Sequence, residues 1–288
     1  MMLKTTYQKV WLLTVLLTGF ASCTELIDIE LDSTYRRLVV SGSVNTDSIN
    51  HLVQLTTTSD YFSNVPSPRI TDAVVELEYE DRIIRLLEQD TMPGVYRTPF
   101  AFRGIPNTTY QLHISQVDVD EDGIHETYNA VTTLPPCAIL DSIQLTYFLS
   151  PYASGYQLSM YALDPPTREW YSFKMLKNSD LLTDTLSKYS VQSDDFFNGS
   201  YIYGLPVGFF WDDDPREALQ PGDTVTLELN SIEKAYYDFV VDAQLEIMGN
   251  NPLFSGPSAN VRSNIDNGGK GIFAAYSAQR ISVIVPEI

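Results

Sequence analysis

The chain has few of the side chains that enzymes most often use for metal binding and nucleophilic chemistry: two cysteines and three histidines among 288 residues. His51, His113 and His125 lack the H-E-x-x-H spacing of zinc peptidases. The sequence also contains no G-x-S-x-G elbow and no phosphate-binding loop. Carboxylates paired for glycoside hydrolysis leave no sequence pattern, because their pairing is spatial. We therefore expect a protein that is not an enzyme, with no catalytic residue and no cofactor.

Basic residues are also scarce, with 18 Lys and Arg against 37 Asp and Glu, a net charge of −19. Removing Lys4 and Lys9, the only charges before Cys23, leaves 16 basic residues and a charge of −21. Such a surface repels phosphate backbones, so we expect no nucleic-acid partner. The hydrophobic content of 44% and the 18 tyrosines indicate a globular body.

Long apolar runs are absent after the N-terminal segment. Lys4 and Lys9 precede an uncharged stretch that is too short for a comfortable membrane span of about 20 apolar residues. Residues 1–22 therefore predict a signal peptide. Its end, Phe20-Ala21-Ser22-Cys23, resembles the bacterial lipobox, in which the cysteine thiol carries a diacylglycerol. We expect lipidation of Cys23 and membrane attachment through that lipid; the alternative is an ordinary signal peptide with an incidental cysteine.

If Cys23 is acylated, Cys137 has no disulfide partner. Its apolar neighbours, Leu134 to Leu140, favour a buried structural thiol over a nucleophile. Residues 23–36 form an acidic segment that resembles the surface-export signal of Bacteroidota lipoproteins; a solvated tether is the alternative. The expected address is the outer membrane, lipid-anchored and at the cell surface.

Residues 37–134 alternate apolar and polar side chains between turn residues, which predicts short strands. The expected strands span 38–44, 52–58, 73–79, 83–87, 95–96, 110–114 and 127–132. Seven short strands over about 100 residues are typical of a β-sandwich. Pro93-Gly94-Val95-Tyr96, with the later Gly104 to Leu112, resembles transthyretin-like modules, which implies binding or spacing. We expect an immunoglobulin-like or transthyretin-like sandwich here.

Leu134-Pro135-Pro136 breaks the alternation and predicts a domain boundary. Residues 135–288 predict a second β-rich domain with one helix near 232–248, which Ser231 would cap. The expected strands of this domain span 143–149, 155–162, 170–176, 224–229, 273–276 and 281–285. The segment 250–271 predicts an irregular loop that caps a sheet or contacts a partner.

Several segments together resemble a family of uncharacterised Bacteroidota outer-membrane lipoproteins. They are the lipobox, the opening strand Leu38–Gly42, the loop Asp194–Gly199, Asn251–Phe254, Ser263–Ile265 and Gly268–Tyr276. Genes of this family commonly lie beside TonB-dependent receptors. The resemblance covers nearly the whole mature chain and implies an address and a neighbour, not a reaction.

Asp118, Asp120 and Asp122 alternate along a predicted turn that ends at Gly123. Alternating carboxylates suit a hard cation such as Ca²⁺, and the start of the segment resembles an EF-hand loop. Its twelfth position is Asn129, however, not the bidentate glutamate of that loop. The choice is therefore between a calcium site and an acidic hairpin tip, and we favour the hairpin tip.

Phe209, Phe210 and Trp211 stand between Gly208 and the run Asp212–Asp214. This punctuation predicts an exposed loop, and aromatic anchors ringed by polar residues are typical of interface hot spots. The three residues are candidate partner contacts; the alternative is that they fold back into a core. A wider set of aromatics could form a glycan platform: Tyr147, Phe148, Tyr152, Tyr156, Trp170, Phe209, Phe210 and Trp211.

Six Asp-Ser or Asp-Thr pairs are followed by an aliphatic residue, Thr or Met, which resembles the O-glycosylation site of Bacteroidota envelope proteins. The acceptor hydroxyls would be those of Ser33, Ser48, Thr91, Ser142, Thr185 and Thr224. Turn chemistry is the alternative, because Asp-Ser and Asp-Thr also start turns.

The expected function is that of a non-catalytic accessory subunit of an outer-membrane complex. The expected partner is a TonB-dependent receptor or another large β-barrel. Two alternatives stay open: a glycan- or peptide-binding surface lipoprotein that works alone, and an adhesin or structural subunit.

Overall fold

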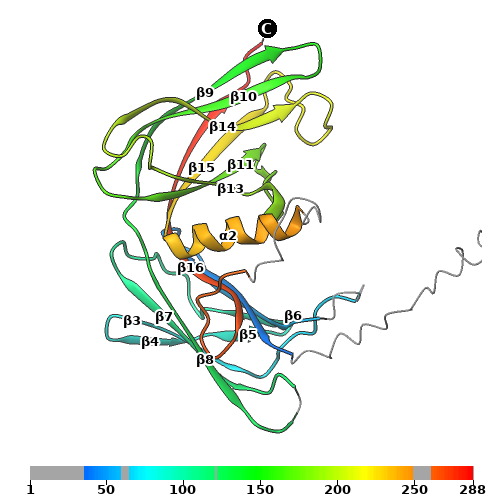
Figure 1. Ribbon diagram of the computed structural model, residues 1–288, viewed down its shortest axis with the longest axis vertical. Helices are drawn as coiled ribbons and strands as arrows, with labels where there is room; N and C mark the ends of the chain where they lie inside the picture. Colours follow the sequence, from blue (N-terminus) through cyan, green and yellow to red (C-terminus); the bar gives the residue numbers. More distant parts are fainter. Residues whose placement is uncertain (1–35, 60–64, 121, 249–260, 288) are drawn as a thin grey trace, which may run out of the picture. The chain divides into compact units, whose positions relative to one another are not determined.

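The computed structural model describes residues 36–59, 65–120, 122–248 and 261–287 (Figure 1). These residues form three β-sheets and one α-helix, which confirms the expected mainly β fold. Among them, no helix is long and apolar enough to cross a membrane. Residues 1–22, Cys23, the acidic segment and Ser33 lie outside the described residues.

The described residues contain sixteen strands, one 3₁₀ helix and one α-helix. The first eight are β1 (Leu38–Asn45), β2 (Leu52–Thr57), β3 (Val74–Tyr79), β4 (Arg82–Arg85), β5 (Leu87–Gln89), β6 (Met92–Arg97), β7 (Thr109–Val117) and β8 (Glu126–Thr133). The other elements are β9 (Ile139–Leu149), β10 (Ser154–Leu163), β11 (Trp170–Lys177), β12 (Asp180–Leu181), the 3₁₀ helix η1 (Leu186–Lys188), β13 (Ser190–Ser193), β14 (Tyr201–Trp211), β15 (Thr224–Ile232), α2 (Lys234–Ile247) and β16 (Lys270–Ile284).

A nine-stranded sheet joins the two halves of the sequence. Its strand order is β12-β11-β15-β16-β1-β2-β6-β5, and β13 pairs with β11 beside this path. The strand β16 makes the junction: its first half pairs in parallel with β1, and its second half pairs antiparallel with β15. The sequence predicted two closing strands, at 273–276 and 281–285. The structure has one continuous strand instead, whose pairing passes from β1 to β15 at Tyr276.

The first core lies between this sheet and a four-stranded sheet of order β4-β3-β7-β8, at the bottom of Figure 1. The alternation in β3 and β7 places Leu77, Leu112 and Ile114 inside, each no more than 2% exposed. Tyr96 and Tyr110 are buried too, and their hydroxyls donate or accept hydrogen bonds with loop backbone. The sequence prediction of a β-sandwich rests on this alternation.

The second core lies between the other end of the nine-stranded sheet and a three-stranded sheet of order β14-β10-β9, at the top of Figure 1. It draws on residues between Ala138 and Leu229, with Val285. The first core draws on residues between Leu38 and Leu134, with Ile265, Phe273 and Ala275 of the C-terminal part. Along the sequence, the change from the first core to the second thus falls near Leu134 and Pro135. The strand β16 contributes to the first core and also packs on the second. The division into two domains stays a prediction.

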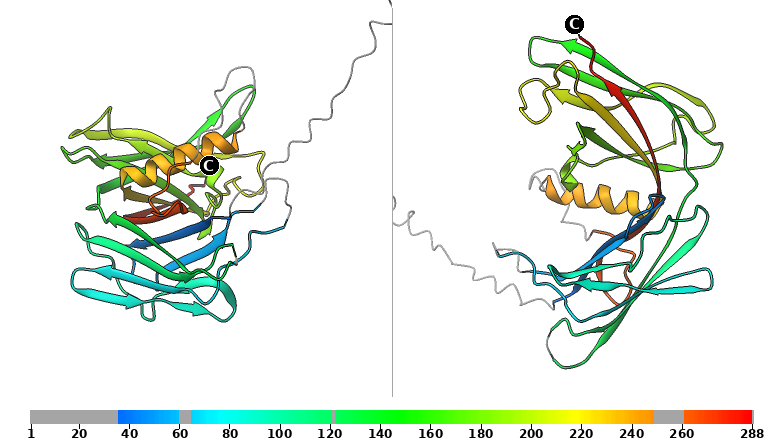
Figure 2. Two further views of the ribbon diagram at one scale, coloured as in Figure 1. Left: turned by 60° about the horizontal axis from the view of Figure 1, so that its bottom comes forward. Right: turned by 180° about the vertical axis from the view of Figure 1, so that it is seen from behind.

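Helix α2 lies on the inner side of the curve of the nine-stranded sheet (Figures 1 and 2). Its Val240 and Ala243 are buried, at a spacing that keeps both on one face. The expected cap, Ser231, belongs to β15 instead, where its Oγ accepts a hydrogen bond from the Ala138 N–H at 3.0 Å. The N-cap is Glu233, whose carboxylate accepts a hydrogen bond from the Thr132 hydroxyl at 2.6 Å.

The described part of the irregular segment before β16 packs on the first core. Ile265 is buried and pairs with Ala130 of β8. The Asn264 side-chain oxygen accepts a hydrogen bond from the Phe273 N–H at 3.0 Å, and its NH₂ group donates one to the Phe273 carbonyl at 2.7 Å. This arrangement agrees with the expectation of a segment that caps a sheet. Residues 249–260 lie outside the described part, so Asn251–Phe254 is not placed.

Candidate functional site

The aromatic residues expected on an exposed loop lie on a strand. Phe209, Phe210 and Trp211 are the last three residues of β14, and the turn begins only at Asp212. Successive side chains of a strand point to opposite faces. Phe210 is therefore fully buried, whereas Phe209 and Trp211 are 39% and 37% exposed. The predicted loop was wrong, because the flanking glycine and acidic run are compatible with a strand that has one buried face.

Phe210 belongs to the second core. It pairs in register with Tyr156 of β10, which is also buried. Two residues earlier, a Cβ at Gly208 would lie 1.9 Å from the sulfur of Met175, so the glycine leaves room for this side chain of β11. Of the three candidate contacts, Phe210 is thus a packing residue, and its removal would test folding instead of binding.

Phe148, Phe209 and Trp211 form an aromatic cluster on the outer face of the three-stranded sheet. The rings of Phe209 and Trp211 stack at 5.5 Å with an angle of 20°. Phe148 of β9 meets both edge-on, at 6.0 Å from Phe209 and 5.6 Å from Trp211. Edge-to-face and offset-stacked pairs at 4.5–7 Å are the favoured geometries of aromatic rings. The cluster is therefore held in shape by its own contacts.

Gly155 explains how Phe148 reaches Trp211 across an intervening strand. Gly155 of β10 pairs in register with both Phe148 and Trp211, and it carries no side chain. A Cβ there would lie 2.1 Å from the Phe210 carbonyl oxygen, so only glycine fits. The two rings can consequently close over the bare position. This cross-strand arrangement has no signal in the sequence order of the three aromatics.

The end of the three-stranded sheet that carries the aromatic cluster also has exposed apolar and acidic groups. The β9–β10 hairpin exposes Leu149 and Tyr152 at 78% and 98%. A groove of about 530 Å³ runs beside the cluster and is lined by Ala153, Trp211, Asp213, Asp214 and Pro215. The Tyr147 hydroxyl donates to the Asp212 carboxylate at 3.0 Å and ties the hairpin strand to this turn.

The aromatic cluster suits contact with a partner. Two stacked rings, one edge-on ring and an acidic rim resemble an interface hot spot, in which aromatic anchors are surrounded by polar groups. Of the wider aromatic set, Tyr156 and Phe210 are buried, and the other six are at least partly accessible.

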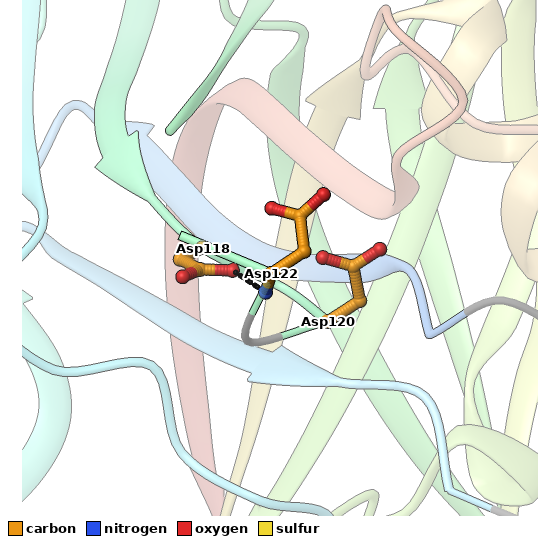
Figure 3. A group of neighbouring side chains, drawn as sticks. All are labelled: Asp118, Asp120 and Asp122. Carbon is orange, nitrogen blue, oxygen red and sulfur yellow. Dashed lines mark hydrogen bonds between the residues drawn. The ribbon is translucent and has the colours of Figure 1, made fainter. Parts of the chain in front are cut away.

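The acidic turn between β7 and β8 brings the three predicted aspartates together (Figure 3). Carboxylate oxygens of Asp118, Asp120 and Asp122 all lie within 4.8 Å of one another. The Asp118 carboxylate accepts the N–H groups of Asp122 and Gly123 at 3.1 and 3.0 Å. The Asp122 carboxylate accepts the N–H of Ile124 at 2.7 Å. Turn chemistry thus accounts for Asp118 and Asp122, and calcium binding stays a prediction.

The expected O-glycosylation hydroxyls lie at the surface where they are described. Ser48, Thr91, Ser142 and Thr185 are exposed, and Thr224 is half-buried at the start of β15. Thr91 is in the β5–β6 turn, whereas Ser142 is inside β9, so turn chemistry does not explain every pair. Cys137 is half-buried, and burial raises the pKa of its thiol, with Glu169 adding to the shift. That environment is consistent with the expected structural role.

Comparison with models of protein families gives a match. The family model of the domain of unknown function DUF4249 covers residues 24–282, which is nearly all of the chain after Cys23. A search of the curated proteins finds no match. On this coverage, the chain belongs to the DUF4249 family.

Proposed function

We propose that this protein is a lipid-anchored, surface-exposed accessory subunit of an outer-membrane complex in Bacteroidota. It binds and does not catalyse, and its partner is a TonB-dependent receptor or another large β-barrel. The signal peptide and lipobox support the anchor, and the acidic segment after Cys23 supports export to the surface.

The aromatic cluster is the observation that carries the binding role. Phe209 and Trp211 keep more than a third of their surface exposed although they sit on a regular strand of a sandwich. Leu149 and Tyr152 of the β9–β10 hairpin, which follows Phe148 in the chain, are exposed as well. Contiguous exposed apolar surface rimmed by polar residues marks interaction sites in soluble domains. The charge of −19 keeps such a surface from associating unspecifically with membranes and nucleic acids.

Purification of the native protein in a mild detergent tests the complex directly. A large barrel should co-purify in a fixed ratio, and its sequence would identify the partner. A Phe209→Ala, Trp211→Ala double variant should lose the barrel while the membrane fraction still contains the variant. A protein that purifies alone at native abundance contradicts the accessory role and favours a binding protein that works by itself.

The anchor has a separate test in cell fractionation. Cys23→Ala should move the protein from the membrane fraction to the soluble fraction, because the proposed lipid attachment needs the cysteine thiol. A Ser22→Ala variant keeps a small residue before the cysteine and should stay membrane-bound. Retention of Cys23→Ala after washes with high salt and carbonate contradicts lipid anchoring.

A further inference from the structure

A cavity of about 330 Å³ opens on the face of the nine-stranded sheet that carries α2. Its lining comes from β1, β2, β6, β11 and β16, with Tyr189 next to η1 and Tyr236 of α2. The volume lies within the range of about 300–1,000 Å³ that is usual for small-molecule sites. The cavity shares no residue with the aromatic cluster.

The strands β1 and β2 have two different faces. One face packs in the first core, and the other carries small polar side chains that line the cavity. In β1, Ser41 and Ser43 alternate with the buried Val40 and Val44. In β2, Gln54 alternates in the same way with Val53 and Leu55. The sheet is therefore apolar toward the first core and of mixed polarity toward the cavity, where Leu52, Val95 and Ile272 also contribute to the lining. Polar residues are common on any solvated face of a sheet. Ser41, Ser43 and Gln54, however, line one cavity together with Tyr189, Tyr236 and Tyr276.

Several polar groups of the lining have no hydrogen-bond partner elsewhere in the described chain. These are the side chains of Ser41, Ser43, Gln54, Tyr189 and Tyr236. Burial raises the pKa of the Tyr236 hydroxyl, and the nearby phenols of Tyr189 and Tyr276 raise it further. Tyr236 is half-buried, so water can reach its side chain, and a ligand with matching groups would replace that water.

The charge of the lining is neutralised within the protein. The Lys174 ammonium lies 2.9 Å from a Glu228 carboxylate oxygen and 5.1 Å from the centre of the Tyr276 ring. The other Glu228 oxygen accepts a hydrogen bond from Arg280 Nε at 2.7 Å. Among the described residues, the lining itself contains no carboxylate. Neither an anion nor a cation therefore gains a free counter-charge, and a neutral ligand fits best.

We propose that this cavity binds a neutral, hydroxyl-rich small molecule of the sugar class, of one or two rings. Hydroxyl and amide side chains both donate and accept, as the hydroxyls of a sugar do. Tyrosine rings offer broad apolar faces for its C–H groups and a polar edge for its hydroxyls. The site is separate from the proposed docking surface, so either can fail without the other.

Saturation-transfer NMR with the full protein, in a detergent without a sugar headgroup, tests the ligand class. The probes are glucose, galactose and maltose, with glucuronate and glucosamine as charged counterparts. The saturation-transfer signal of at least one neutral sugar should reach a plateau as its concentration rises. The charged counterparts should bind about tenfold more weakly or not at all. The proposal is overturned if no neutral sugar saturates, or if the charged counterparts bind equally well.

Tyr236→Phe tests the site itself, because it removes one hydroxyl and keeps the ring. The affinity for the sugar found above should fall about three- to tenfold, the effect of one lost hydrogen bond. Tyr237→Phe is the matched control: it is the next residue of α2, does not line the cavity and should bind normally. Ser43→Ala is a second variant that leaves α2 unchanged and should weaken binding similarly. Unaltered affinity in both Tyr236→Phe and Ser43→Ala overturns the site.

Discussion

The two smaller sheets pack on the same nine-stranded sheet but turn different side chains to solvent. The four-stranded sheet exposes polar groups: His113 of β7 lies 3.0 Å from the Glu78 carboxylate and 2.8 Å from the Asn129 amide oxygen. The three-stranded sheet exposes the aromatic cluster. An antiparallel sheet with one solvated face is expected to be polar on that face. The difference supports placing the proposed interaction surface on the three-stranded sheet.

The largest expected effect separates the inner and outer faces of β14. Phe210→Ala should lower the free energy of unfolding by about 3–5 kcal/mol, the range for a large aromatic in a core. Phe209→Ala should lower it by less than about 1 kcal/mol, since that ring is on the surface. Urea denaturation followed by circular dichroism measures both. Similar losses for the two variants would contradict the strand assignment of this segment.

The next effect contrasts a buried ion pair of the central sheet with a surface pair of the polar face. Glu228 is 5% exposed and pairs with Lys174 and Arg280. Glu228→Gln should cost about 3 kcal/mol, because it leaves the largely buried Lys174 ammonium without its carboxylate, whereas Arg280 keeps its pairing with Asp47. Glu78→Gln, beside the accessible His113, should cost less than about 1 kcal/mol. Urea midpoints that fall equally in both variants would contradict this contrast.

The same carboxylate predicts a pH dependence. Burial alone would raise the pKa of Glu228, but Lys174 and Arg280 outweigh it and hold that pKa below its ordinary value of 4.5. The pair therefore contributes stability above pH 4.5, and this contribution is lost as the pH falls through the lower folded value. Glu228→Gln should flatten that part of the stability profile. A profile of the same slope in the variant would show that other carboxylates cause it.

A smaller effect tests the outer faces as binding surfaces. Trp211→Ala should weaken partner binding by about 2 kcal/mol, or roughly 30-fold, as for an interface anchor. Ile83→Ala is the control on the polar sheet, because Ile83 is 65% exposed and also apolar. Capture of the purified barrel on each immobilised variant gives the ratio. Equal binding by Trp211→Ala and the parent, with Ile83→Ala weaker, would move the interface to the other sheet.

The smallest expected effect concerns the acidic turn of the four-stranded sheet. Calcium should leave the melting temperature unchanged relative to chelator, because backbone N–H groups already occupy the Asp118 oxygens. A cation that bound only the folded state would raise it by mass action. If calcium does raise it, and the triple variant Asp118→Asn, Asp120→Asn, Asp122→Asn loses the gain, the turn is a cation site.

Local pattern was enough to predict most of the strands. The alternation predicted strands at 73–79 and 110–114, and the structure has β3 at Val74–Tyr79 and a longer β7 at Thr109–Val117. The helix was also predictable, within two residues at its start, from apolar residues at helical spacing. The sequence pattern gave a wrong prediction at Phe209–Trp211, because the neighbouring glycine and acidic run indicated a loop where the structure has a strand. It was also wrong at Ser231, whose hydroxyl accepts a hydrogen bond from the N–H of Ala138 and does not cap the helix.

By itself, the sequence determined the mainly β fold, the helix near 232–248 and the acidic charge, because these depend on composition and on neighbours a few residues apart. It also determined that Asp118, Asp120 and Asp122 would share one turn. Only the tertiary structure decided which aromatic is core, how Phe148 meets Trp211 across Gly155, and which polar residues line the cavity. Those outcomes depend on pairing and register between strands far apart in the chain, and one residue of register exchanges the buried face for the exposed one.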